Sequence, residues 1–378
     1  MSNKDLFSDF PPISKAEWLQ KVAKDLKTKP LEDLEWEISE GLRISPFVHA
    51  EDFDSAPPAL RGNEPSWEIC ENIRVEDAAN ANAQALEALT GGAESLELEF
   101  NSPPDWSIFE LSLAGVQLDF IGLHFTGTGT MQNPANVFSH LLRLAKAKNI
   151  DTHALRGSVA YDPIRAGGII DWRYLVDLLE FVQESFPLFK IISVELLEHI
   201  NPAVALGETL RKANEYLTKL NERGIAPEKA MQHIQFSVPI GKSYFLEIAR
   251  IRALKLLWIN VLKSWEAPLQ YPAIRAHFQP EAYTDDLYTN MIRATSMSMS
   301  AVLGGATQLC VLPYDAQRSA AAVYPPAFGR RIARNVQHLM KMETDMVETN
   351  DPAAGSYYIE NLTAVLAQKA WLAFAQPV

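Results

Sequence analysis

The sequence predicts an α/β protein folded as a (β/α)8 TIM barrel, and three observations indicate this fold class. From about residue 66, short runs rich in β-branched and aromatic residues alternate with longer helical patterns. Eight such units can be counted, which is the number that closes a barrel of this kind. The main alternative, a doubly wound open sheet, is disfavoured because no G-x-G-x-x-G motif follows the first strand.

Residues 1–65 are predicted to form an arm rather than a domain. A helix is expected over residues 15–25, with Ser14 as its N-cap and Glu17 completing a capping box. The apolar stripe of this helix consists of Trp18, Leu19, Val22 and Leu26. An extended, proline-punctuated run should follow over residues 42–58. Because the arm has too few apolar clusters to fold alone, we expect it to wrap the main body or a partner chain.

The barrel itself is assigned to residues 66–345. Its predicted strands lie at residues 67–72, 96–100, 116–123, 155–160, 190–194, 234–238, 273–278 and 308–312. Helical patterns between them include residues 77–89, 171–185, 209–221, 245–263 and 287–303. Glycine pairs at 91–92 and 304–305 follow two of these helices, where a left-handed C-cap is expected. Residues 346–378 are predicted to start a C-terminal helical linker.

Composition excludes several classes of function. The formal net charge of -13 disfavours nucleic-acid binding, which needs clustered cations. No apolar run approaches the roughly 18 residues of a membrane helix, and the N-terminus lacks the features of a signal peptide. The two cysteines, Cys70 and Cys310, make no disulfide framework and have no metal-ligand spacing, so no metal site is predicted. A reducing, cytoplasmic location is therefore expected.

Two local patterns have competing interpretations. Residues 350–358, NDPAAGSYY, combine a turn-forming Asp-Pro with a glycine and two tyrosines, which favours a loop that locks the last helix onto the barrel. Arg330, Arg331 and Arg334 lie at helical spacing and could meet phosphates or carboxylates. Salt bridges to an acidic neighbouring face are the favoured interpretation for these arginines.

Three histidines are functional candidates. His153 sits in a D-x-H pattern similar to a cobalt-ligating signature, but Arg156 replaces its glycine, so the match is attributed to chance. His233, near the start of a predicted strand, and His277, near the end of one, are better placed, although an isolated histidine is more often structural. No phosphate loop, H-E-x-x-H or G-x-S-x-G motif is present. Residue chemistry alone therefore leaves the function undetermined.

Several short runs carry a family resemblance that covers nearly the whole chain. They are EGLRISP at 40–46, PPALRG at 57–62, GSVAYDP at 157–163, VLPYD at 311–315, RRIARN at 330–335 and DPAAGSYY at 351–358. In this combination and order they resemble the methylmalonyl-CoA mutase family, and its small subunits in particular. The resemblance implies a substrate barrel followed by a cobalamin-binding domain, and the second of these is expected to be absent here.

The resemblance also implies a chemistry and a partner. Family members are isomerases that interconvert methylmalonyl-CoA and succinyl-CoA with adenosylcobalamin, which supplies the radical chemistry while the protein positions the substrate. The CoA arm threads the barrel in these enzymes. Their heterodimers pair a catalytic large subunit with a small one that lacks the catalytic set. We therefore expect a large-subunit partner and no cofactor bound to this chain alone.

This chain departs from the catalytic pattern along the predicted cavity. The frame W-T-I-R-Q-Y of catalytic first strands is replaced by WEICEN at 67–72, so Glu68, Cys70 and Asn72 stand for threonine, arginine and tyrosine. Glu68 and Glu71 are expected to repel the phosphates of CoA. Further polar family residues are replaced by Ala160, His233 and Gln235, and a Gly-Tyr-His segment is missing near residues 192–194. No catalytic residue is therefore predicted.

Three functional hypotheses follow from these departures. The first is a non-catalytic small subunit that stabilises a catalytic partner. The second is an acyl-CoA mutase barrel of altered specificity that works with a separate cobalamin-binding chain. The third is a bare scaffold whose barrel is filled by side chains. A substrate-binding mouth, vestigial under the first hypothesis, would be lined by Arg61, Asn72, Ser158, His233 and Gln235.

Overall fold

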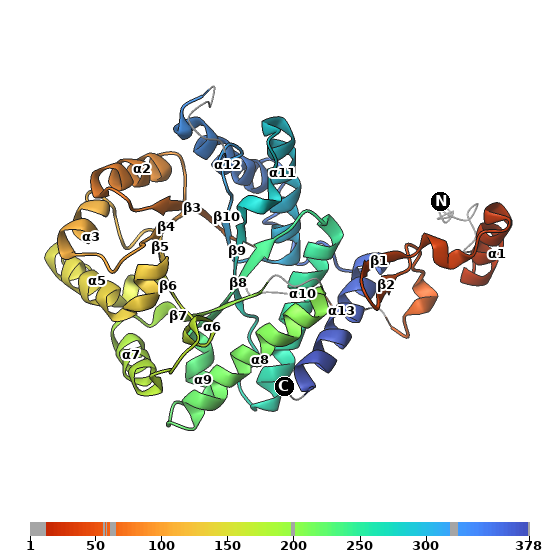
Figure 1. Ribbon diagram of the computed structural model, residues 1–378, viewed down its shortest axis with the longest axis horizontal. Coiled ribbons are helices and arrows are strands. Elements are labelled where there is room, and N and C mark those ends of the chain that lie inside the picture. The colour runs from red at the N-terminus through yellow and green to blue at the C-terminus, as the bar shows by residue number, and fades with distance from the viewer. Residues whose placement is uncertain are drawn as a thin grey trace, which may run out of the picture.

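The fold is a closed parallel barrel, as predicted. The computed structural model describes residues 13–55, 57, 59–60, 66–197, 201–317 and 324–376. Within them, eight strands pair in the cyclic order β10-β3-β4-β5-β6-β7-β8-β9 (Figure 1). These strands are β3 (Glu68–Arg74), β4 (Ser95–Glu99), β5 (Gly122–Thr126), β6 (Arg156–Tyr161), β7 (Leu188–Glu195), β8 (Ile234–Ile240), β9 (Ala273–Phe278) and β10 (Gln308–Cys310).

One predicted strand was misplaced. The expected strand at 116–123 is mostly a turn that leads into β5, which begins only at Gly122. Val116 and Leu118 in this turn are almost completely buried, at 1% and 0% exposure. Their alternating burial imitates the two-residue period of a strand, and this imitation explains the wrong prediction.

Helices surround the barrel (Figure 1). They are α2 (Ala78–Thr90), α3 (Trp106–Ser112), α4 (Thr128–Gln132), α5 (Pro134–Lys148), α6 (Pro163–Ala166), α7 (Trp172–Ser185), α8 (Pro202–Asn221), α9 (Pro227–Ala230), α10 (Tyr244–Ser264), α11 (Leu287–Gly304), α12 (Pro326–Met342) and α13 (Tyr357–Ala375). Helix α8 begins earlier than predicted because the Asn201 side chain caps it and Pro202 occupies its first turn. In the described parts of the chain, no helix is long and apolar enough to cross a membrane.

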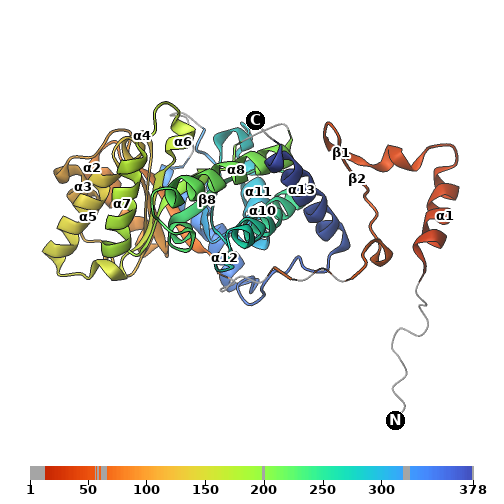
Figure 2. The ribbon, with the colours of Figure 1, turned by 90° about the horizontal axis from the view of Figure 1, so that it is seen from below.

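The N-terminal arm stands to one side of the barrel (Figures 1 and 2). Helix α1 (Lys15–Leu26) starts with the predicted capping box between Ser14 and Glu17. The run predicted to be extended, 42–58, begins with β2 (Leu42–Ile44), which pairs with the preceding β1 (Trp36–Ser39) in a β-hairpin, and a 3-10 turn (Ala50–Asp52) interrupts it. Within this arm, the Trp18 ring packs edge-on against Phe47 with the ring centroids 4.5 Å apart.

A buried ion cluster fastens the last helix to the body. Arg252 of α10 pairs with Asp351 and, at 2.7 Å, with Glu360 of α13. The backbone N–H of Leu60 also donates to Asp351, at 2.6 Å. All three charged side chains are at most 5% exposed. The loop at 350–358 therefore locks α13 in place, as its sequence predicts.

Candidate functional site at the barrel mouth

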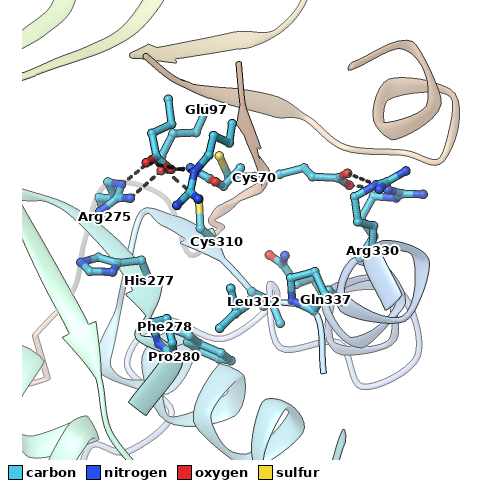
Figure 3. Close-up of a pocket in the computed structure, with 18 residues that line it drawn as sticks. Cys70, Glu97, Arg275, His277, Phe278, Pro280, Cys310, Leu312, Arg330 and Gln337 are labelled. Carbon is cyan, nitrogen blue, oxygen red and sulfur yellow. Dashed lines mark hydrogen bonds and ion pairs between the residues drawn. The ribbon is translucent and has the colours of Figure 1, made fainter. Parts of the chain in front are cut away.

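A cavity of about 270 Å³ opens at the carboxyl ends of the barrel strands (Figure 3). Strands β3, β4, β9 and β10 line it on the barrel side, and helix α12 lines it on the other. In barrels of this class, functional groups gather at this end because the βα loops meet there. The polar side chains of this cavity are therefore the first candidates for function.

An ion pair spans the interior below this cavity. Arg275 of β9 reaches Glu97 of β4 with two hydrogen bonds, of 2.5 Å from Nε and 2.6 Å from Nη2. Asn72 Nδ2 donates to the same carboxylate at 2.8 Å, and Arg275 also donates to Ser237 Oγ at 2.8 Å. Burial alone would raise the pKa of Glu97, but the charge and hydrogen bonds of Arg275 lower it to about 2. Glu97 is therefore ionised and held in place.

Both cysteines of the chain lie beside this ion pair (Figure 3). Cys70 of β3 and Cys310 of β10 are register partners on adjacent strands. Gln308 Nε2 donates to Cys70 Sγ at 3.1 Å, and Cys310 Sγ lies 3.8 Å from Glu97 Oε2. The hydrogen bond with Cys70, burial and the nearby carboxylate raise the pKa of the Cys310 thiol. The thiol therefore stays protonated at neutral pH.

His277 completes the polar wall of the cavity. It sits on β9 next to Cys310 of β10 in the strand register. Burial, followed by the positive charge of Arg275, lowers the pKa of His277 to about 3. Its Nε2 is 3.7 Å from Glu195 Oε1. At neutral pH the ring is therefore an uncharged imidazole, which can accept a hydrogen bond or a metal.

A second polar cluster lies nearer the amino ends of the strands. His124 of β5 contacts Ser158 Oγ at 2.8 Å through Nδ1 and Glu68 Oε2 at 3.1 Å through Nε2. Arg156 Nε donates to the other oxygen of Glu68 at 3.2 Å. Although burial favours the neutral acid, these hydrogen bonds and charges lower the pKa of Glu68. Glu68 is thus an ionised carboxylate whose charge is balanced by Arg156 within the barrel.

A larger cavity, of about 960 Å³, opens at the amino ends of the strands. Its cationic lining residues are Arg156, Lys190, Lys255 and Lys341. Burial and the neighbouring Arg252 lower the pKa of Lys255 to about 8. Among the residues that the structure describes, none lines both this cavity and the one at the mouth. The two cavities are therefore lined by separate sets of residues.

The five predicted mouth residues do not line a single cavity. Asn72 borders the mouth, whereas Gln235 lines the cavity at the amino ends and donates to Ser193 Oγ at 3.2 Å. Ser158 is held by His124 in the second polar cluster. His233 is buried before β8 and bonded to the Phe189 carbonyl at 2.7 Å. Arg61 lies outside the described residues.

Two of the three candidate arginines of α12, Arg330 and Arg334, make the salt bridges of the favoured interpretation. Arg330 pairs with Glu71 at 3.3 Å and Glu87 at 2.6 Å, and Arg334 contacts the same two carboxylates. Glu71 therefore belongs to the contact between β3 and α12. It is not free to repel a ligand's phosphates from the barrel axis, which corrects the role expected for it. Arg331 lies over the Phe328 ring, 5.2 Å from its centroid.

The prediction missed Glu97, Arg275 and Cys310 as functional residues. A signal for the first two was present, since each interrupts an otherwise mostly apolar strand segment, LELEF at 96–100 and AIRAHF at 273–278. A charge in such a strand needs a partner inside the barrel. For Cys310 no signal existed, because its nearest functional neighbour, Cys70, lies at the other end of the barrel sequence.

Fold and cavities together define a (β/α)8 barrel with a polar, internally ion-paired axis. Sequence comparison refines this class: the profile of the family described as methylmalonyl-CoA mutase matches residues 106–376. The chain therefore belongs to the methylmalonyl-CoA mutase family.

Two of the similar relatives are named small subunits. The methylmalonyl-CoA mutase small subunit of Porphyromonas gingivalis is 32% identical over 98% of this chain, and that of Streptomyces virginiae is 30% identical over 97%. The large subunit of Streptomyces virginiae is 26% identical over 95% of the chain. The chain spans 63%, 64% and 56% of the lengths of these three proteins.

Adenosylcobalamin, which the family resemblance implies, does not fit the described residues of the mouth. A cavity of about 270 Å³ is near the lower limit of roughly 300–1,000 Å³ for drug-sized ligands, and a corrin is far larger. His153 lies in a 3-10 turn (Thr152–Ala154) that precedes β6, at the opposite end of the barrel. His153 is therefore not placed to ligate a cobalt ion at the barrel mouth.

Proposed function

We propose that this chain is a non-catalytic small-subunit component of a methylmalonyl-CoA mutase and supports a catalytic large subunit. The observation that supports the proposal is that three side chains of β3 are already hydrogen-bonded to other residues of the barrel. Glu68 is bound by His124, Cys70 by Gln308 and Asn72 by Glu97. These are the three positions at which catalytic chains of the family carry threonine, arginine and tyrosine.

The divided interior supports the same proposal. A CoA arm that threads the barrel has to pass from one opening to the other. Here Arg275 reaches from β9 to Glu97 on β4, three strands away around the barrel, and separates the two cavities. Displacing Arg275 would leave the buried Glu97 carboxylate without its cation, which costs about 1–3 kcal/mol.

The arm supplies a surface for the large subunit. On α1, the stripe residues Trp18, Leu19 and Val22 are only partly buried, and no residue of this helix is fully buried. Half-exposed apolar side chains on a helix that stands apart from the barrel suit a helix that packs against a partner. We therefore assign α1 to the contact with the large subunit.

Calorimetric titration of the isolated chain tests the non-catalytic role. Methylmalonyl-CoA, succinyl-CoA and free CoA should give no binding heat at millimolar concentration, because the β3 positions and the axis are occupied. Micromolar binding of any of them, worth about 8 kcal/mol, would overturn this role.

The partner role is tested by mixing the chain with the large subunit of a related mutase. We expect a heterodimer in size-exclusion chromatography, and loss of this complex in Leu19→Asp. The matched control is Gln20→Asp, on the exposed face of the same helix. Equal behaviour of the two variants would remove α1 from the interface.

One observation favours a second candidate function. The cavity of about 960 Å³ is lined by four cationic residues and three carboxylates, Glu68, Glu94 and Asp351. This excess of positive charge favours an anionic acyl-CoA ester, as expected of a barrel with altered specificity that uses a separate cobalamin chain. Under this alternative, Arg156→Gln and Lys190→Gln would weaken acyl-CoA binding measured by the same titration. Under the primary proposal there is no binding for these variants to weaken.

A further inference from the structure

Three possible metal ligands meet beneath the mouth of the barrel. The Sγ atoms of Cys70 and Cys310 and a carboxylate oxygen of Glu97 all lie within 4.8 Å of one another, and all three residues are buried. They come from β10, β3 and β4, which are consecutive strands of the barrel (Figure 3). Adjacent strands of a closed sheet hold their side chains more rigidly than loops do.

We propose that Cys70, Cys310 and Glu97 form a binding site for a divalent cation of the zinc type. Two thiolates and one carboxylate are ligands that zinc accepts in proteins. The fourth position faces the cavity of about 270 Å³, from which a water molecule or another small ligand can enter. Three protein ligands with one open position form an open coordination site rather than a closed structural one.

The distances within the set fit such an ion. With Zn–S near 2.3 Å and Zn–O near 2.0–2.2 Å, a tetrahedral site places its sulfur and oxygen ligands about 3.6 Å apart. The separation between Cys310 Sγ and Glu97 Oε2 is 3.8 Å. Cys70 Sγ lies within 4.8 Å of both of these atoms, so side-chain movements of about 1 Å bring all three ligands to tetrahedral distances.

The surrounding side chains hold the ligands in position. Oε1 of Glu97 accepts hydrogen bonds from Arg275 and Asn72, whereas Oε2 accepts one from Arg275 and faces Cys310 Sγ. When the Cys310 thiol loses its proton, the second lone pair of Oε2 is available to a cation. Gln308 donates to Cys70 Sγ and supports its thiolate form. Such outer hydrogen bonds are typical of metal sites in proteins.

The charges of the bound state also balance. Binding releases the two thiol protons to solvent, which leaves two thiolates, the Glu97 carboxylate and the Arg275 guanidinium with a net charge of minus two. A divalent cation neutralises this charge. The site should consequently prefer divalent over monovalent cations and bind more tightly as pH rises.

Titration of the reduced full-length chain with Co²⁺ tests the site. The chain has two cysteines in total, so a sulfur-to-cobalt charge-transfer band can arise only from Cys70 and Cys310. We expect this band to saturate at one equivalent and to disappear when Zn²⁺ is added in competition. A folded, fully reduced protein that shows no such band at excess Co²⁺ would overturn the proposal.

Variants distinguish the ligands from their neighbours. Cys70→Ser and Cys310→Ser should each weaken the charge-transfer band strongly, and Glu97→Gln should lower the affinity for Co²⁺. Gln308→Leu should retain the band with an affinity reduced by about 10–100-fold. His153→Ala, outside the cavity, should change nothing. An unchanged affinity in Glu97→Gln, with folding verified by circular dichroism, would exclude the carboxylate and with it the three-ligand site.

Discussion

Two buried arginine–carboxylate clusters in this molecule share their chemistry and differ in their surroundings. Arg275 and Glu97 meet inside the barrel, and Arg252 meets Asp351 and Glu360 between α10 and the start of α13. The first pair borders a cavity that contains two thiols and an imidazole. In the second, Arg252 and Glu360 lie among packed side chains and close a loop, and only Asp351 reaches the wall of the larger cavity.

The difference teaches which buried charges indicate function. A fully packed ion cluster needs no further partner, and its role is to define how two elements fit together. An ion pair that borders a cavity can exchange contacts with water, a cation or a ligand. The two clusters are buried to a similar degree, and they differ in which side chains face a cavity: both partners of the first pair do, whereas in the second cluster only Asp351 does.

The largest effect is expected from breaking the packed cluster. Arg252→Met leaves two carboxylates buried without a cation and should lower the free energy of unfolding by about 3–5 kcal/mol. Urea denaturation followed by circular dichroism measures this loss. Arg43→Met is the matched control, because its exposed pair with Glu37 should contribute at most about 1 kcal/mol. Equal effects of the two variants would contradict the assignment of Arg252.

A smaller loss is expected at the cavity. Arg275→Met should cost about 1–3 kcal/mol, because water can reach Glu97 from the mouth and Asn72 still donates to it. The double variant Arg275→Met with Glu97→Leu should recover part of this loss, since replacing both charges removes the unpaired carboxylate. Denaturation of the single and double variants forms the test. A double variant less stable than Arg275→Met would show that the unpaired Glu97 carboxylate is not the cause of the loss.

The contribution of the Arg275–Glu97 pair to the free energy of unfolding should depend on pH between about 4.5 and 2. The folded-state pKa of Glu97 is lowered from 4.5 to about 2, so its stabilising contribution is complete above pH 4.5 and is lost as pH falls toward 2. The pKa of Glu71 is raised by burial, and this carboxyl therefore contributes with the opposite sign. Urea midpoints at several pH values should fall less steeply with acid in Glu97→Gln than in the wild type. Parallel curves would argue against the ionised Glu97.

The smallest effect on global stability is expected from the arm, which has neither cluster. Trp18→Ala removes the contact with Phe47 and should change the unfolding of the barrel by no more than about 0.5 kcal/mol. Hydrogen exchange should accelerate in α1 and remain unchanged in the barrel strands. Faster hydrogen exchange in both the arm and the barrel strands would instead show that the two unfold as one cooperative unit.

The fold could be predicted from the sequence because each βα unit combines the apolar pattern of a strand with the 3.6-residue period of a helix. The capping box of α1 and the loop that holds α13 were also readable, since their signals lie within a few residues. The strand at 116–123 failed because a buried turn imitates alternation. The site was largely hidden, because Cys70 and Cys310 meet only through the closure of the barrel, and the pairing of Glu97 with Arg275 depends on which side chains face inward.

The pairing of β10 with β3 also bears on how the protein is made. The first barrel strand along the chain, β3, finds its second neighbour only after residue 310 has been synthesised. Until then, one edge of β3 has no strand beside it and is open to wrong pairing during translation. The two thiols meet at this seam, so their protection from an alkylating reagent would report the moment at which the ring of strands is completed on the ribosome.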